Sequence, residues 1–155
     1  MPGRVEIHHF ASQLLEGNAL RDPAQRRVPV YLPADYDEEA RDYPVLFALA
    51  GFTGSGLSFL NYDWYQESLP QRLDRLIDAE AMPPVVVVMV DGMTRVGGNQ
   101  YIDSPAVGPW ASHIVEELVP WAERTFRLMP GRDHRGVFGK SSGGYGSLMM
   151  AFEHS

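Results

Sequence analysis

Cysteine is absent from this 155-residue chain, and its absence removes several chemistries at once. Disulfide bonds, thiolate metal sites and a cysteine nucleophile are all excluded, so covalent catalysis must use another side chain. The histidines, aspartates and glutamates do not recur at metal-ligand spacings either. We therefore expect neither a metal nor a cofactor.

Basic residues and long apolar runs are also scarce. Thirteen basic residues against twenty acidic ones give a net charge of −7, which disfavours nucleic acid or an anionic membrane as a partner. The longest apolar run, VVVVMV at residues 85–90, is far shorter than the roughly 20 residues that span a bilayer. Met1 is not followed by a basic and then apolar signal pattern. We expect a soluble, cytoplasmic protein.

Predicted strands and helices alternate along the chain, as in one α/β domain. Apolar runs predict strands at residues 5–10, 27–32, 45–50, 85–90 and 135–139. Helices are predicted to begin near Pro70 after a Ser68 cap, at Ser112, and at Ser142, the last continuing to the chain end. Pro120 should kink or split the second helix. The alternation predicts a mostly parallel sheet with helices on both faces, in which the first two strands can pair antiparallel.

The sequence GKSSG at residues 139–143 matches G-x-S-x-G, the nucleophile elbow, in which Ser141 would sit on a strained turn between a strand and a helix. Gly139 and Gly143 are needed because side chains there would collide with the neighbouring strand or helix. Composition alone produces this pattern roughly 0.1 times per chain of this length, so its context decides its weight. The context fits, because a predicted strand precedes it, a predicted helix follows it, and an earlier strand ends in an AGFTG loop at residues 50–54.

Two other interpretations of the glycines fail on spacing. The segment 139–141 also resembles the end of a phosphate-binding loop, G-x-x-x-x-G-K-[ST], but the first glycine position is occupied by His134. Gly54 and Gly56 begin a dinucleotide fingerprint whose third glycine position is Phe59. A glycine-rich turn with a serine that only caps a helix remains the non-catalytic alternative.

Five segments carry a resemblance to a known family, in the order in which that family uses them. They are VYLP at 30–33 with Tyr36, LAGFTGSG at 49–56, PVVVVMVDG at 84–92, ELVP at 117–120 and GKSSGGYGSL at 139–148. On these segments the chain resembles the putative-esterase family of α/β-hydrolases, which includes esterase D, enterochelin esterase-like enzymes and the mycolyltransferases.

The resemblance implies an α/β-hydrolase fold in which Ser141 forms an acyl-enzyme. It also implies that the backbone N–H groups of Phe52 and Ser142 form the oxyanion hole that stabilises the tetrahedral intermediate. Two positions depart from the family pattern. Ala50 stands where many relatives have histidine, and Ser142 stands where relatives often have methionine.

A base for Ser141 is the missing feature. In this fold the acid and the histidine follow the serine in the chain, and a serine without a base is a poor nucleophile. His154 lies thirteen residues further along the predicted last helix, roughly 20 Å away along its axis, and Glu153 fails in the same way. Structural roles are expected for His8 and His9, of which strand alternation points one inward and one outward. Surface or capping roles are expected for His113 and His134.

We therefore expect residues 1–155 to be the N-terminal portion of a single α/β-hydrolase domain, truncated just after the elbow. The C-terminal strands and helices would be absent, and the acid and histidine of the triad would lie beyond residue 155.

These observations favour a serine carboxylic-ester hydrolase that acts on a small-molecule ester through an acyl-serine intermediate and is inactive as this fragment. Acyl transfer to an alcohol or sugar is the alternative within the family, and a non-catalytic partial gene product or binding module is the alternative outside it. Trp64, Tyr101 and Trp110 belong either to the core or to a substrate pocket. Asp91 begins a long glycine-rich loop, predicted at residues 91–105, and either orients the loops of the site or caps a turn. The ester and the oligomeric state stay open.

Overall fold

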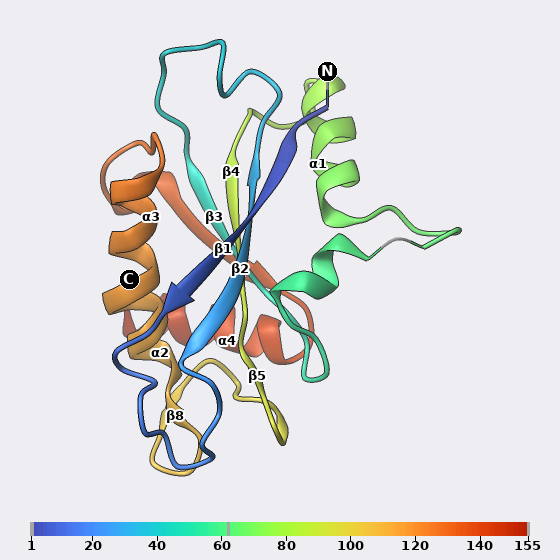
Figure 1. Ribbon diagram of the computed structural model, residues 1–155. Coiled ribbons are helices and arrows are strands. Elements are labelled where there is room, and N and C mark those ends of the chain that lie inside the picture. The colour runs from blue at the N-terminus through green and yellow to red at the C-terminus, as the bar shows by residue number, and fades with distance from the viewer. Residues whose placement is uncertain (1, 62, 155) are drawn as a thin grey trace.

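A mixed five-stranded sheet forms the centre of the computed structural model, which describes residues 2–61 and 63–154 (Figure 1). Its strands, in spatial order, are β1 (Arg4–Ala11), β2 (Gln25–Leu32), β4 (Val86–Val90), β3 (Val45–Leu49) and β9 (Arg135–Gly139). β3 runs parallel to β4 and β9, whereas the β1–β2 and β2–β4 pairs are antiparallel. All five predicted strands are present, but the two N-terminal strands make the sheet mixed rather than mostly parallel.

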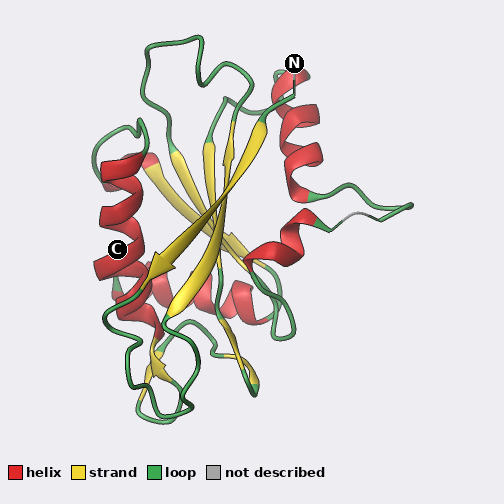
Figure 2. Cartoon of the chain, in the orientation of Figure 1, coloured by secondary structure: helices red, strands yellow, loops and turns green. Residues whose placement is uncertain are grey.

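Helices cover both faces of the sheet (Figure 2). One face packs against the 3-10 helix η1 (Gly56–Leu60) and α1 (Leu69–Asp78). The other packs against α2 (Trp110–Ser112), η2 (His113–Leu118), α3 (Val119–Thr125) and α4 (Ser142–Glu153). A further 3-10 turn, η3 (Arg132–His134), leads into β9. As predicted, Ser68 caps α1, because its hydroxyl accepts a hydrogen bond from the N–H of Gln71.

The burial of β4 on both faces explains why residues 85–90 are all apolar. Val86, Val88 and Val90 face the helices α2 to α4, whereas Val87 and Met89 face α1 and η1. All five side chains are fully buried. A strand covered on both faces cannot show polar alternation, so the whole run must be apolar.

The helix predicted from Ser112 begins earlier, at Trp110, and changes geometry along its length. Ser112 is not its N-cap; both the N–H and the hydroxyl of Ser112 bond to the carboxylate of Asp103. The turn η2 is a π-helix, and α3 begins beside Pro120. Residues 110–125 stay helical without a break, and the hydrogen-bond pattern changes from π to α beside Pro120, which has no N–H to continue the ladder.

The π-helix holds a buried histidine–carboxylate hydrogen bond that the sequence analysis missed. His113 was expected at the surface or as a cap, but its side chain is fully buried, with Nδ1 2.7 Å from Oε2 of Glu117. The same carboxylate accepts hydrogen bonds from the hydroxyl of Ser12 and from the N–H groups of Gln13 and Leu14. Glu117 therefore ties the β1–β2 loop to the helix. Burial opposes its charge, but these hydrogen bonds outweigh burial and lower its pKa.

We expect Glu117→Ala to lower the free energy of unfolding by about 2 kcal/mol at neutral pH, because several partly buried donors lose a charged acceptor. Glu116→Ala, at the exposed neighbouring position, is the matched control. Since the folded-state pKa is lowered, this contribution is complete above the ordinary value of 4.5 and disappears as pH falls through the folded pKa. Urea unfolding at neutral and acidic pH measures both effects. Equal costs for the two variants at neutral pH would contradict the anchoring role.

The segment between β4 and α2 was predicted to be a long loop, and it contains two short hairpins. β5 (Met93–Thr94) pairs with β6 (Gly97–Gly98), and β7 (Asp103–Ser104) pairs with β8 (Gly108–Pro109). β5 and β8 lie at the lower end of the sheet in Figure 1. Because β3, β4 and β9 are parallel, the loops that follow them all emerge at this end, where α/β folds place their sites.

Candidate active site

Ser141 lies on a tight turn between the end of β9 and the start of α4. Its backbone has φ 59° and ψ −120°, a region that residues other than glycine seldom adopt. Ser141 is exposed and occupies the N-cap position of α4, where the helix dipole favours negative charge. A strained backbone that presents an exposed hydroxyl at a helix N-terminus is the arrangement that a nucleophile elbow requires.

Gly139 and Gly143 lie where α4 crosses the end of β3. A Cβ atom on Gly143 would be 1.9 Å from the carbonyl oxygen of Leu49, and one on Gly139 would be 2.5 Å from the same oxygen. A Cβ on Gly139 would also lie 2.5 Å from the backbone of Gly143. The absence of side chains at both positions therefore lets the elbow rest directly on the backbone of β3.

The loop after β3 lies against the elbow. Leu49 and Gly139 are paired in the β3–β9 register, so the chain leaves both strands at neighbouring points. A Cβ on Gly51 would be 3.8 Å from the Cβ of Ser141. The structure thus brings Ser141, Ser142 and the 50–54 loop that contains Phe52 to the same end of the sheet.

The orientation of the Phe52 N–H follows from the turn that contains it. The carbonyl of Gly51 accepts a hydrogen bond from the N–H of Gly54 at 2.9 Å, so this carbonyl points into the turn. In a trans peptide the N–H of the next residue points the opposite way, so the Phe52 N–H faces out of the turn. Ser142 is the first residue of α4, where backbone N–H groups have no intrahelical partner.

The β5–β6 hairpin supports this loop from behind, a contact that the sequence analysis missed. A Cβ on Gly97 would lie 2.4 Å from the ring of Phe52, and one on Gly98 would lie 3.0 Å from its Cα. Gly97 also has φ 105°, which side-chain-bearing residues rarely adopt. The adjacent glycines at positions 97 and 98, within a predicted loop, were the signal in the sequence that could have indicated this close contact.

The aromatic candidates separate clearly. Trp110 belongs to the core, fully buried with its ring N–H donating to the carbonyl of Val107. Trp64 is 89% exposed, so it does not belong to the core of the described residues. Asp91 accepts a hydrogen bond from the N–H of Met93 and pairs at 3.1 Å with the buried side chain of Arg26, so it braces the chain just after β4.

No histidine in residues 2–61 and 63–154 forms a hydrogen bond with Ser141. As predicted from strand alternation, His8 faces partly inward and His9 outward. His8 pairs with Glu6, and His134 bonds to the carbonyl of Pro130. The last helix ends at Glu153, one residue before His154, which is its C-cap.

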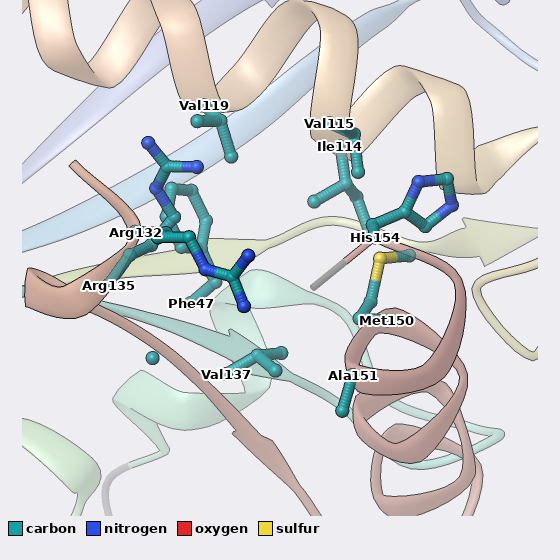
Figure 3. Close-up of a pocket in the computed structure, with 11 residues that line it drawn as sticks. Phe47, Ile114, Val115, Val119, Arg132, Arg135, Val137, Met150, Ala151 and His154 are labelled. Carbon is teal, nitrogen blue, oxygen red and sulfur yellow. The ribbon is translucent and has the colours of Figure 1, made fainter.

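A cavity of about 290 Å³ lies away from the elbow (Figure 3). Its apolar walls include Phe47, Ile114 and Met150, and its polar side chains are Arg132, Arg135 and His154. Arg135 begins β9 and Met150 lies near the end of α4, whereas Ser141 lies between the end of β9 and the beginning of α4. This cavity therefore does not open beside Ser141.

Among the residues that the structure describes, no group of three or more histidine, cysteine, aspartate or glutamate side chains is arranged to hold a metal ion. Within the same residues, no helix has the length and apolar character needed to cross a bilayer.

Comparison with known proteins places the fold and the family. An esterase from Mycobacterium tuberculosis (strain H37Rv) is 34% identical over 129 residues, which are 82% of this chain and 26% of the relative. The structure of a ferulic acid esterase superposes with a TM-score of 0.81 at 22% identity, covering 99% of this chain and 54% of that one. A Staphylococcus aureus structure described as the fluorophosphonate-binding serine hydrolase F gives a TM-score of 0.71 at 19% identity, covering 97% and 52%.

The chain thus spans about a quarter of the length of the curated relative and about half of the solved structures. The structural matches assign the α/β-hydrolase fold. The model of the family described as "Putative esterase" matches residues 21–155. On the family match and the mycobacterial relative, the chain belongs to the Putative esterase family of α/β-hydrolases.

Proposed function

We propose that these residues form the nucleophile half of a serine carboxylic-ester hydrolase, with Ser141 as the nucleophile. The observation that carries the proposal is the strained backbone of Ser141, exposed at the N-terminus of α4 and packed beside Gly51. A serine with positive φ persists only where the surrounding structure holds it, and here Gly139 and Gly143 let the elbow pack closely on β3. The similarity to a structure named as a serine hydrolase supports the same mechanism.

The reaction uses the elbow as follows. The Oγ of Ser141 attacks the ester carbonyl as its proton passes to a general base, and the carbonyl oxygen becomes an oxyanion. The N–H groups of Phe52 and Ser142 stabilise that charge. Collapse of the intermediate releases the alcohol, which takes up the proton and leaves an acyl-serine. Water then attacks the acyl carbonyl and releases the acid.

The base is proposed to be a histidine, oriented by an acid, supplied by residues outside 1–155. This proposal rests on the positions of His8, His9, His113, His134 and His154 described above. It also agrees with the α/β-hydrolase order of serine, acid and histidine along the chain. The substrate is a small-molecule ester.

Covalent labelling tests the proposal. The longest reading frame that contains residues 1–155 is treated with a fluorophosphonate, which phosphonylates an activated serine irreversibly. Trypsin cleaves after Lys140, so the labelled peptide begins at Ser141, and its fragment ions distinguish Ser141 from Ser142 and Ser147. We expect one label per protein, on Ser141, and much slower labelling of residues 1–155 alone because the base is missing. A label on another residue would remove Ser141 as the nucleophile.

A further inference from the structure

Tyr101 occupies an unusual backbone position in the loop between β6 and β7. It has φ 58° and follows Gln100 with φ 61°, so two consecutive residues with side chains adopt the left-handed region. The side chain of buried Asn99 holds this conformation. Its Oδ1 accepts a hydrogen bond from the N–H of Tyr101 at 2.6 Å, and its Nδ2 donates to the carbonyl of Gly92 at 2.7 Å. Strain that is supported in this way commonly marks a functional position.

The Tyr101 side chain connects three parts of the site. Its ring lies against Gly92, just after β4, and against Gly146 in α4, where added Cβ atoms would come within 2.6 Å and 2.7 Å of the ring. Its hydroxyl donates a hydrogen bond of 2.9 Å to the carbonyl of Ala50, at the end of β3. The side chain is 2% exposed, and burial raises the pKa of the phenol above its ordinary value. The hydroxyl therefore keeps its proton and remains a donor.

The Ala50 carbonyl begins the loop that carries the candidate oxyanion donor. The hydroxyl of Tyr101 fixes the Ala50–Gly51 peptide, and the Gly51–Gly54 hydrogen bond fixes the next one. The Phe52 N–H belongs to the second plane, the Gly51–Phe52 peptide, and the first plane is the anchor from which the 51–54 turn starts. Gly51 joins the two planes and lies beside Ser141, so a displacement of the Ala50–Gly51 peptide would shift the turn, and the donor with it, relative to the nucleophile.

We propose that Tyr101 is a positioning residue for ester hydrolysis, whose hydroxyl holds the Ala50 carbonyl so that the Phe52 N–H faces the oxyanion formed at Ser141. Tyr101 contacts neither the substrate nor the reacting atoms in this role. The inference rests on the proposed function, because it requires Ser141 to be the nucleophile.

Tyr101→Phe removes only the hydroxyl and tests the inference in the active reading frame. With p-nitrophenyl acetate we expect kcat to fall about tenfold and KM to stay within about twofold, because the donor is needed in the transition state and not for binding the ester. Loss of a whole oxyanion donor lowers kcat by about 10²–10³-fold, so a misoriented donor should lower kcat by a smaller factor. Fluorophosphonate titration of active sites corrects kcat for any loss of folded protein.

Tyr31→Phe is the matched control. Tyr31 is 1% exposed, and its hydroxyl donates to Oδ1 of Asp74 at 2.7 Å, on the face of the sheet covered by α1. It therefore also loses one buried phenol hydrogen bond, but away from the elbow, and we expect its kcat to match the wild type. Hydrogen–deuterium exchange gives a second comparison, in which Tyr101→Phe should accelerate exchange in residues 50–54 and Tyr31→Phe should not.

The outcomes separate the two proposals. A kcat for Tyr101→Phe equal to that of Tyr31→Phe, or a loss of kcat without faster exchange in residues 50–54, overturns the positioning role. If Ser141→Ala is inactive in the same assay, the proposed function survives that result. If Ser141→Ala retains activity, the proposed function fails and the role of Tyr101 fails with it.

Discussion

Ser141→Ala is expected to lower kcat for ester hydrolysis by at least about 10⁴-fold in the active reading frame. The change removes the only atom that forms the covalent bond, whereas the backbone donors at Phe52 and Ser142 remain in place. Steady-state hydrolysis of p-nitrophenyl acetate measures the loss. Ser147→Ala is the matched control, because the hydroxyl of Ser147 lies in the same helix and bonds only to the carbonyl of Gly143. Comparable losses in the two variants would indicate damage to α4 rather than loss of a nucleophile.

The backbone of Ser141 makes a second substitution informative. Ser141→Gly should be as inactive as Ser141→Ala. Its free energy of unfolding should nevertheless be about 1 kcal/mol higher than that of Ser141→Ala, because glycine adopts φ 59° without strain. Denaturant unfolding of both variants measures the difference. A glycine variant no more stable than the alanine variant would show that the elbow stores little strain.

Gly143→Ala is expected to destabilise the protein by about 4 kcal/mol or more and to abolish activity. Its new Cβ would lie 1.9 Å from the carbonyl oxygen of Leu49 and 2.9 Å from that of Ala50. Both contacts are with backbone, so no side-chain rotation can relieve them, and either β3 or α4 must move. Thermal or urea unfolding together with the esterase assay measures the two effects.

The neighbouring glycine supplies the control for this prediction. A Cβ on Gly144 would come no closer than 3.4 Å to any atom outside its local helix, at the carbonyl oxygen of Gly139. Gly144→Ala should therefore be neutral, or should stabilise α4 by up to about 1 kcal/mol through helix propensity. If both substitutions cost the same, the contact between α4 and β3 is not what requires glycine at position 143.

Local signals explain which elements the sequence predicted well. The all-apolar run 85–90 identified β4 because a strand buried on both faces has no polar position. Ser68 identified the start of α1 because capping depends on residues three apart. The elbow was predictable for the same reason, since G-x-S-x-G describes a few consecutive residues whose backbone must fit between a strand and a helix.

Contacts between distant segments explain what was missed. His113 is buried because Glu117 also binds the loop at residues 12–14, about one hundred residues earlier in the chain, and no local pattern encodes that meeting. The place of the Tyr101 ring likewise depends on the space left by Gly146 in α4. The sequence could indicate that loops meet at the end of the sheet, but the contact of Tyr101 with Ala50 required the fold.

β3 supports both the elbow and the loop at residues 50–54, and it is held more firmly in the sheet than β9 is. It is hydrogen-bonded to a parallel strand on each side, whereas β9 lies at the edge of the sheet within the described residues. Gly139 and Gly143 lie in close contact with the backbone of Leu49, and the 50–54 loop begins one residue later. Local opening is easiest at sheet edges and rarest at doubly paired strands. The proposed nucleophile and the proposed oxyanion donors therefore both rest on β3, so we expect fraying of β9 alone to leave the distance between them unchanged as long as the elbow keeps its contacts with Leu49.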